Sequence, residues 1–464
     1  MDFGRSTPFQ DQRILLFLAA VLVVATFGLS SYLYINADVA FLVWAADQVL
    51  GPAVYGRDIL DVNPPLCMLI YVPAALLAQF IGFDWGIRIW MLFLSLLALL
   101  VLWQVADRSL RASVATVLVL FLILAYPHHY AQREQIAFLL CAPYVAGPSQ
   151  RRSWGLASGI MAGIGFLMKP YFLIPLALVF ALRRRLGDEE RAILLVGIAY
   201  GLVLVFFFQP YLFEMVPAAT ATYWAISYSW YQIALQVVVV LVGIAPFAMG
   251  GAVLLAARPF LMATLGFTIA AVLQSKGFMY HFIPAFGFLV MSLTVGISNP
   301  KQTAAKVAGL ILLLQVAWLS GIVGLWLSYR QQTTQVNSRI QYEIDRAGSF
   351  ASLHPNPFPA FPAAIYTHSK FTGIAICQIF LPAVKQLLAE QDAGKSNMAY
   401  ELALSQAKRE LGRKPNLVFT TNKNHDGTSF NYLDWLLRDE EFRDLWKDYE
   451  DYRIIGPYSL YRLR

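Results

Sequence analysis

The first 329 residues of this chain form an almost uncharged sequence in which apolar runs follow one another closely. Of the 28 acidic residues, 13 precede residue 330 and 15 follow it. Charged residues make up 14% of the chain, against about 25% in an average globular protein. This distribution excludes a soluble enzyme, a disordered protein and a nucleic-acid binder, and it indicates a polytopic α-helical membrane protein.

The lengths of the apolar runs predict about 11 transmembrane helices. A further run at 66–82 follows Asn63-Pro64-Pro65 and contains Pro73, so we expect a re-entrant or interfacial segment there. The predicted spans lie at 14–34, 87–106, 112–127, 134–147, 154–168, 170–182, 191–208, 232–257, 259–274, 281–297 and 304–328.

The basic residues divide unequally between the two sides of this arrangement. With the N-terminus in the cytoplasm, 13 Lys and Arg residues of the first 329 fall on the cytoplasmic side and five on the outer side, in keeping with the positive-inside rule. We therefore expect a multi-pass protein of the inner (plasma) membrane. Its transmembrane module would cover 1–329, with an outer loop at 35–86, and a small α+β domain at 330–464 would lie on the periplasmic side.

The balanced charge of the C-terminal region, with 17 basic and 15 acidic residues, is typical of an aqueous surface. Here the pattern predicts strands at 363–367 and 416–420 and helices at 382–412 and 430–448. A terminal hairpin is expected at 452–464, with its turn at Gly456-Pro457.

Polar residues that flank the spans without resembling membrane anchors all fall on the outer side of the predicted topology. A charge near the bilayer usually marks function or a pairing partner, so their common side predicts one outward-opening polar site. They are Asp38, Asp58, Asp61, Arg88, His128, His129, Arg133, Glu134, Lys169, Lys276, Tyr280 and His281.

Asp38 stands where the first span leaves the membrane, before an apolar, helix-like run at Val39–Leu50 that we expect to lie along the interface. A partly buried carboxylate at this position suits a general base that deprotonates a hydroxyl nucleophile. The alternative is that Asp38 caps the helix that begins at Val39.

Six short motifs occur within the first 290 residues. In chain order they are Asp38 after the first span, Tyr55-Gly-Arg57-Asp58, Asn63-Pro-Pro-Leu66, Arg133-Glu134, Lys169-Pro170 after a glycine-rich helix, and Tyr280-His281-Phe-Ile-Pro284. Together they resemble the motifs of GT-C glycosyltransferases, in the branch of dolichyl-phosphate-mannose protein mannosyltransferases and bacterial aminoarabinose transferases. Two positions depart from that family: Val39 follows Asp38 where members often carry Asp-Glu, and Glu134 replaces an Asp that many relatives use.

The resemblance implies transfer of one sugar from a polyprenyl-phosphate carrier to a glycan, glycolipid or protein acceptor on the outer face, with inversion. Asp38 would be the general base and Glu134 the second acidic residue. No Asp-x-Asp pair follows from these residues, so dependence on a divalent metal stays open. The donor phosphate and lipid would be bound by Lys169, Lys276, His281, Arg88 and Tyr280, and the substrate loop would contain Tyr55, Arg57, Asp58, Asp61 and Arg133.

Structural alternatives apply to most of these residues. Lys169 and Lys276 could extend to the interface and Arg88 could anchor its span. Glu134 could pair with Arg133 or Arg88, and Asp58 and Asp61 could order the loop near Arg57; His128-His129 lack the spacing of a known metal site.

Two other functions compete with the glycosyltransferase. One is an O-antigen-ligase- or polymerase-like transferase with diphosphate-linked donors. The other is a membrane transporter, although no internal repeat is visible.

Overall fold

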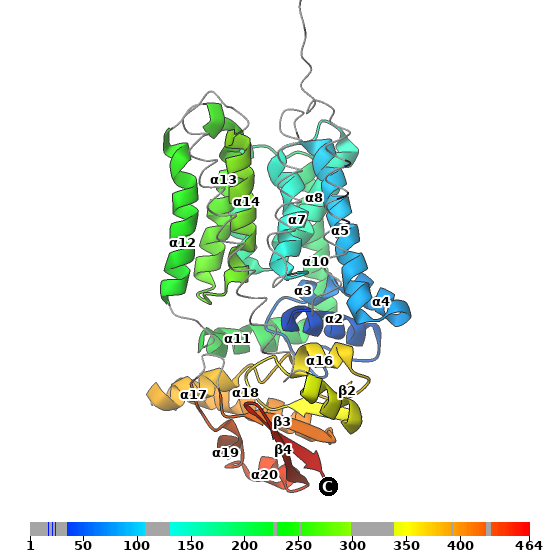
Figure 1. Cartoon of the computed structure of the whole chain (residues 1–464). Coiled ribbons are helices and arrows are strands. Elements are labelled where there is room, and N and C mark those ends of the chain that lie inside the picture. Colours follow the sequence, from blue (N-terminus) through cyan, green and yellow to red (C-terminus); the bar gives the residue numbers. More distant parts are fainter. Residues whose placement is uncertain are drawn as a thin grey trace, which may run out of the picture. The chain divides into compact units, whose positions relative to one another are not determined.

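The computed structural model describes residues 17, 21, 24, 35–106, 130–225, 230–249, 252–297, 338–390, 393–423 and 428–464. These residues are mostly helical, with one small sheet (Figure 1). They divide into two compact units. The helical unit contains 88–106, 130–201, 230–249 and 252–297, and the mixed unit contains 35–87, 202–225 and the described residues from 338 onward.

The helical unit is a bundle of long apolar helices (Figure 1). Two of its helices, α5 and α10, continue into the mixed unit. The elements are α5 (Phe83–Val105), α7 (Arg133–Ala146), α8 (Arg152–Leu167), η1 (Pro170–Phe172), α9 (Leu173–Arg183), α10 (Asp188–Phe207), α12 (Trp230–Ile244), η4 (Ala245–Met249), α13 (Ala252–Leu273), η5 (Met279–Phe282) and α14 (Ile283–Ile297).

Glycines let the helices of this bundle approach one another closely. A Cβ built on Gly165 of α8 would lie 2.7 Å from Cys141 Sγ in α7, and one on Gly159 would lie 2.3 Å from the Glu189 carbonyl oxygen in α10. Both distances are too short for a side chain, so the glycine-rich sequence of α8 is a requirement of helix packing.

Among the described residues, four helices are long and apolar enough to cross a membrane, at Phe83–Val105, Asp188–Phe207, Trp230–Ala248 and Leu255–Leu273. This is compatible with a membrane protein, while the number of 11 spans stays a prediction. The expected spans at 112–127 and 304–328 lie outside the described residues, as does most of that at 14–34. The break expected at residue 258 is absent, because α13 continues through this position with Pro259 inside it.

The mixed unit contains a five-stranded sheet with the strand order β2-β1-β3-β5-β4. Strand β1 (Ser349–Ser352) pairs in parallel with β2 (Lys370–Phe371) and β3 (Leu417–Thr421), whereas β5 (Tyr458–Leu463) is antiparallel to β3 and β4 (Tyr449–Ile455). In register, Phe350 pairs with Leu417 and Thr421 with Tyr458.

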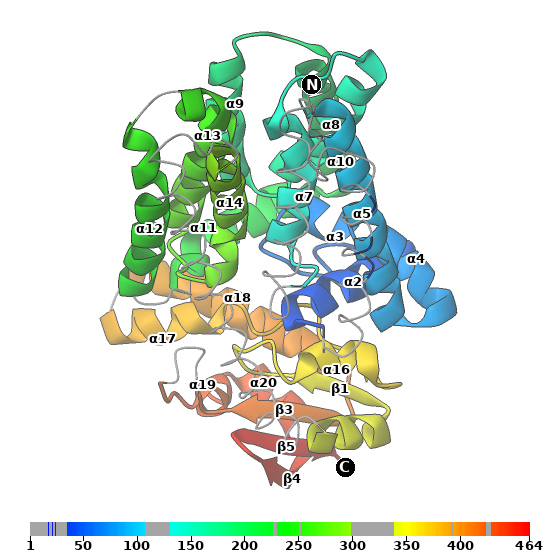
Figure 2. The ribbon, with the colours of Figure 1, turned by 45° about the horizontal axis from the view of Figure 1, so that its top comes forward.

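The helices of the mixed unit come from three separate parts of the chain. Of these, α17 and α18 pack side by side (Figure 2). The helices are α2 (Ala37–Leu50), α3 (Leu66–Leu69), α4 (Val72–Ile81), η2 (Tyr211–Met215), α11 (Val216–Thr222), η3 (Tyr223–Ala225), α16 (Ala360–Tyr366), α17 (Leu381–Glu390), α18 (Ala393–Leu411), α19 (Tyr432–Leu436) and α20 (Glu440–Trp446).

An aromatic cluster joins α2 to the sheet region. The ring of Trp44 lies 5.4 Å from Phe371 and 5.8 Å from Phe361, and the ring of Phe41 lies 5.4 Å from Phe361. Residues 39–46 are all buried. The predicted helix at 39–50 is therefore confirmed, but along 39–46 it packs inside protein and offers no apolar face to a lipid interface.

The expected secondary structure of the C-terminal region is largely confirmed. The predicted helix at 382–412 is the pair α17 and α18, and the terminal hairpin is β4 and β5 around Gly456-Pro457. The strand expected at 363–367 is wrong, because these residues belong mostly to helix α16. Prolines at 359 and 362 stand at the start of this helix, where the amide hydrogen of the first turn has no helical partner.

The expected domain boundary at 329/330 lies outside the described residues. The compact unit that contains the C-terminal region also contains 35–87 and 202–225. The C-terminal segment therefore shares its core with the first loop of the chain.

Candidate functional site

A buried ion pair between Lys169 and Glu134 is the centre of a polar cluster in the helical unit. The Nζ atom of Lys169 lies 2.5 Å from Glu134 Oε1 and donates a second hydrogen bond, of 2.9 Å, to Gln274 Oε1. The side chain of Glu134 is 0% exposed and that of Lys169 is 6% exposed. Lys169 is therefore not a side chain that extends to a membrane interface.

Helix ends bring these three side chains together. Glu134 is in the first turn of α7, where the helix dipole favours a negative charge. Lys169 is the extended residue between α8 and η1, and Gln274 directly follows α13. Since Lys169 and Gln274 are 105 residues apart, only the packing of the bundle makes them neighbours.

Two more basic side chains belong to this cluster. His281 Nε2 of η5 lies 3.9 Å from Glu134 Oε1. Burial, together with the nearby positive charge of Lys169, lowers the pKa of Lys276 from 10.5 to about 7. Tyr280 lies edge-on against His281, with 4.5 Å between ring centroids. The basic cluster, as we call Glu134, Lys169, Lys276 and His281, thus has three basic groups around one carboxylate.

Two buried polar atoms in or next to this cluster have no hydrogen-bond partner among the described residues. Among the described residues, the second carboxylate oxygen of Glu134, Oε2, accepts no hydrogen bond although it is fully buried. The Nε2 group of the adjacent Gln135 also donates none in the same part of the chain. A buried polar atom without a partner costs about 1–3 kcal/mol, so these atoms are suited to a ligand or an ordered water molecule.

Two further predicted site residues of this unit, Arg88 for the donor and Arg133 for the substrate loop, are also buried. Arg88, in α5, is 1% exposed, and Arg133, at the start of α7, is 5% exposed. The ion pairs shown for Glu134 are with Lys169 and His281, and not with Arg133 or Arg88 as the structural alternative expects. His128 and His129 lie outside the described residues.

Asp38 lies in the first turn of α2 in the mixed unit. The N-cap of this helix is Asn36, whose Oδ1 accepts a hydrogen bond of 2.9 Å from the Asp38 amide. The N-cap residue is therefore Asn36, and the alternative role of Asp38 as the cap residue is wrong. The side chain is partly exposed, as a base that meets a substrate must be.

The residues of the Tyr55-Gly-Arg57-Asp58 motif hold the 54–61 loop together. Tyr55 donates a hydrogen bond of 2.6 Å to the Asp61 carbonyl oxygen and packs edge-on against Tyr211. Gly56 has φ +88°, and a Cβ there would lie 2.5 Å from Pro210, so this position requires glycine. Asp61 is 7% exposed, and its Oδ1 accepts two hydrogen bonds from Asn63.

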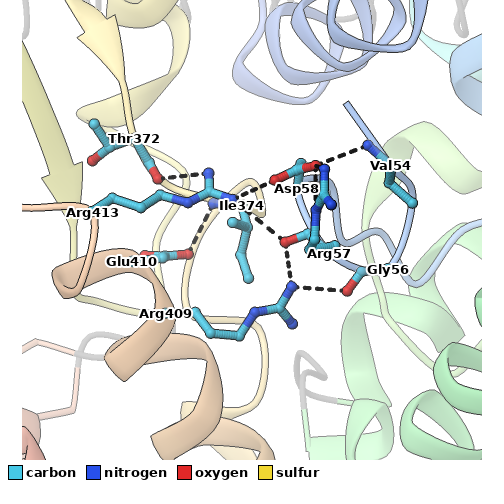
Figure 3. A network of polar contacts seen from close by, with 9 residues as sticks. All are labelled: Val54, Gly56, Arg57, Asp58, Thr372, Ile374, Arg409, Glu410 and Arg413. Atoms are coloured by element: carbon cyan, nitrogen blue, oxygen red, sulfur yellow. Dashed lines mark hydrogen bonds and ion pairs between the residues drawn. The ribbon is translucent and has the colours of Figure 1, made fainter. Parts of the chain in front are cut away.

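Ion pairs fix Asp58 on both sides (Figure 3). Its Oδ2 lies 2.8 Å from Arg57 Nη2 and its Oδ1 lies 2.8 Å from Arg413 Nη2. Hydrogen bonding to Arg57 is the main cause that lowers the pKa of Asp58, and the charge of Arg413 adds to it. These contacts are the ones expected if Asp58 orders the loop, which is the structural alternative to a role in substrate binding.

The charges of three acidic groups act on the buried thiol of Cys377. Burial raises the pKa of this thiol, and the negative charges of Asp38, Glu410 and Asp61 raise it further. Asp38 and Asp61 are therefore within electrostatic range of one sulfur atom. Among the described residues, no three His, Cys, Asp or Glu side chains form a group that could hold a metal ion.

Sequence reasoning missed several residues of these sites. Gln274 had a signal, because it is a polar residue at the end of an apolar run and two positions before Lys276. Glu410 had a weaker one, because Gln406 and Glu410 repeat on the helical face of α18 that carries buried alanines. Arg413 had none, since it stands in a mixed-charge segment that resembles a solvated surface.

No protein-family model, curated protein or solved structure matches the chain. The function is therefore inferred from two groups of side chains alone: the basic cluster, and Asp38 with the other acidic residues that act on Cys377.

Proposed function

We propose that this protein is a membrane glycosyltransferase that moves one sugar from a polyprenyl-phosphate carrier to an acceptor, with inversion and with Asp38 as the general base. The observation that carries the proposal is the basic cluster in the helical unit. It supports binding of a phosphate group, and Asp38 in the mixed unit supports deprotonation of an acceptor hydroxyl.

The charge of the basic cluster favours an anionic ligand. Lys169 has Glu134 as its counter-ion at 2.5 Å, and Lys276 is buried close enough to Lys169 for the two positive charges to repel each other. An anion placed there would offset the repulsion between the two lysines. A phosphate also accepts several hydrogen bonds at once, which suits the two ammonium groups and the imidazole of His281.

The chemistry needs a held leaving group and an acceptor for one proton. The acceptor hydroxyl attacks the anomeric carbon, and the bond from this carbon to the phosphate oxygen breaks with its electron pair on the phosphate. Lys169, Lys276 and His281 stabilise the charge that develops on that oxygen. Asp38 takes the proton of the hydroxyl, and attack from the face opposite the leaving phosphate inverts the anomeric configuration.

The direct test is donor binding by the purified protein in lipid nanodiscs. A panel of radiolabelled undecaprenyl-phosphate sugars is titrated against wild type, Lys169→Gln and Lys276→Met. We expect saturable binding of one donor, weakened at least tenfold in both variants. Absence of saturable binding for every donor would refute the proposal, and unchanged affinity in both variants would remove the basic cluster from the site.

The role of Asp38 needs a test of turnover. We expect Asp38→Asn to bind the same donor as wild type and to lose sugar release, measured with water as the acceptor. The matched control is Asp47→Asn, which alters another partly exposed acidic residue of the same helix and should leave sugar release unchanged. An active Asp38→Asn enzyme would contradict the assignment.

The buried ion pair also favours a second candidate, a membrane transporter. Ionisable residues that pair inside a helical membrane bundle often form ion or proton pathways, and Glu134, Lys169 and His281 are of this kind. Proton-coupled uptake of a charged solute into proteoliposomes, lost in Glu134→Gln, would support that alternative over glycosyl transfer.

A further inference from the structure

The C-terminal end of α18 contacts the 54–61 loop through Arg409, in its last turn, and through Arg413, two residues beyond the helix (Figure 3). Arg409 Nη2 donates to the carbonyl oxygens of Gly56, at 3.0 Å, and Arg57. Arg413 Nη2 pairs with Asp58 Oδ1 at 2.8 Å, while its Nη1 donates to the Thr372 carbonyl oxygen at 3.2 Å. The two guanidinium groups thus bind three consecutive residues of the loop.

A backbone link fixes the same loop one residue before Asp61. The Leu60 amide donates a hydrogen bond of 2.6 Å to the Ile374 carbonyl oxygen. The Ile374 amide in turn donates to Glu410 Oε1 at 3.2 Å. Glu410 lies between the two arginines in sequence, so the end of α18 and the turn after it determine the position of residues 56–60 by side chains and through the Ile374 peptide.

The loop leads directly to one of the three carboxylates whose charges act on Cys377. Asp61 follows Leu60, and its charge, like that of Asp38, acts on the same buried thiol. On its other side the loop packs against Tyr211 and Pro210. A displacement of residues 56–60 would therefore also displace Asp61 relative to Asp38.

We propose that Arg409 and Arg413 are positioning residues, which hold the 54–61 loop so that Asp61 and Asp38 keep the arrangement that turnover requires. The inference rests on the proposed function for its link to turnover, but the loop contact itself can be tested without it. It gives the C-terminal segment a role in the reaction, because α18 contacts the loop that leads to Asp61.

The first measurement is hydrogen–deuterium exchange of the full-length protein in nanodiscs. In Arg413→Gln, we expect amides of the 54–61 loop to exchange at least tenfold faster than in wild type, and in Arg413→Lys less so, because an ammonium can still pair with Asp58 but lacks the planar fork. The control is Lys408→Gln, in the last turn of α18. Lys408 pairs with Asp439 and Glu441 instead of the loop, so this variant should keep the wild-type exchange.

The second measurement is donor hydrolysis, with the undecaprenyl-phosphate sugar that wild type binds. Arg413→Gln should lower kcat about tenfold or more with little change in the KM for donor, and Arg413→Lys should restore part of it. A change in KM alone, or unchanged exchange of the loop, would overturn the inference. If wild type neither binds nor cleaves any donor, the proposed function fails, and the exchange experiment still decides whether α18 holds the loop.

Discussion

Replacement of Lys276 by methionine should abolish a pH dependence of anion binding that the basic cluster otherwise has. Burial and the charge of Lys169 lower the pKa of Lys276 from 10.5 to about 7. Above pH 7 the free protein therefore holds this lysine mostly neutral. A bound anion favours the ammonium form, so binding above pH 7 is coupled to uptake of one proton.

The size of the effect follows from this pKa. Affinity falls about tenfold for each pH unit above 7, until the pKa of Lys276 in the complex is reached. If the anion restores the ordinary value of 10.5, the dissociation constant should rise about 50-fold between pH 7 and pH 9, because half of the lysine is already neutral at pH 7. Lys276→Met has no proton to gain, so its weaker binding should be nearly independent of pH over this range.

Isothermal titration calorimetry in nanodiscs can measure both quantities. The probe is a short-chain prenyl phosphodiester, whose single negative charge does not change between pH 7 and pH 9. Titrations in buffers of different ionisation enthalpy give the number of protons taken up, which should approach one for wild type at pH 8 and zero for Lys276→Met. The same slope and proton uptake in both proteins would refute the argument.

Three further predictions concern buried polar groups. Glu134→Ala leaves the ammonium of Lys169 buried without its counter-ion, and should lower the free energy of unfolding by about 3–5 kcal/mol. The effect would be measured as a lower thermal midpoint in nanodiscs. An unchanged midpoint would contradict the burial of this pair. Burial raises the pKa of Glu410 from 4.5 to about 7. The protonated carboxyl therefore contributes fully to the free energy of unfolding below pH 4.5, and this contribution falls by about 3 kcal/mol as the pH rises to 7. Glu410→Gln should remove this dependence, and should also remove a carboxylic-acid infrared band that titrates near pH 7; persistence of the band would show that another group titrates. The Tyr366 hydroxyl donates a hydrogen bond of 2.6 Å to Asp84 Oδ1 and accepts one from the Ile35 amide. Tyr366→Phe should therefore speed amide hydrogen exchange at Ile35 at least tenfold. Equal exchange rates in the variant and the wild type would disprove this link.

The sequence predicts the local elements well. Apolar runs predict the helices at 87–106 and 191–208 because hydropathy and length are properties of one segment, and the structure has α5 and α10 there. The terminal hairpin is also predicted, because Gly456-Pro457 marks a turn between two short runs. A helix and a strand are harder to distinguish in a short apolar run, which explains the error at 363–367.

The candidate site could be predicted only as a set of residues. Lys169, Lys276, His281 and Glu134 stand out because charges are rare in apolar surroundings, but their sequence does not show which of them pair. Adjacency favours Arg133 as the partner of Glu134, whereas the structure has Lys169 at 2.5 Å. Pairing is decided by which helix ends meet when the bundle packs.

The sequence by itself thus determined the apolar helices, the terminal hairpin and a short set of charged candidates. Only the tertiary structure decided that α2 shares an aromatic core with Phe361 and Phe371, and that Arg413, in the turn after α18, holds Asp58. The physical reason is that burial, which selects these contacts, depends on surfaces far apart in the chain. Such surfaces become neighbours only when the whole unit packs.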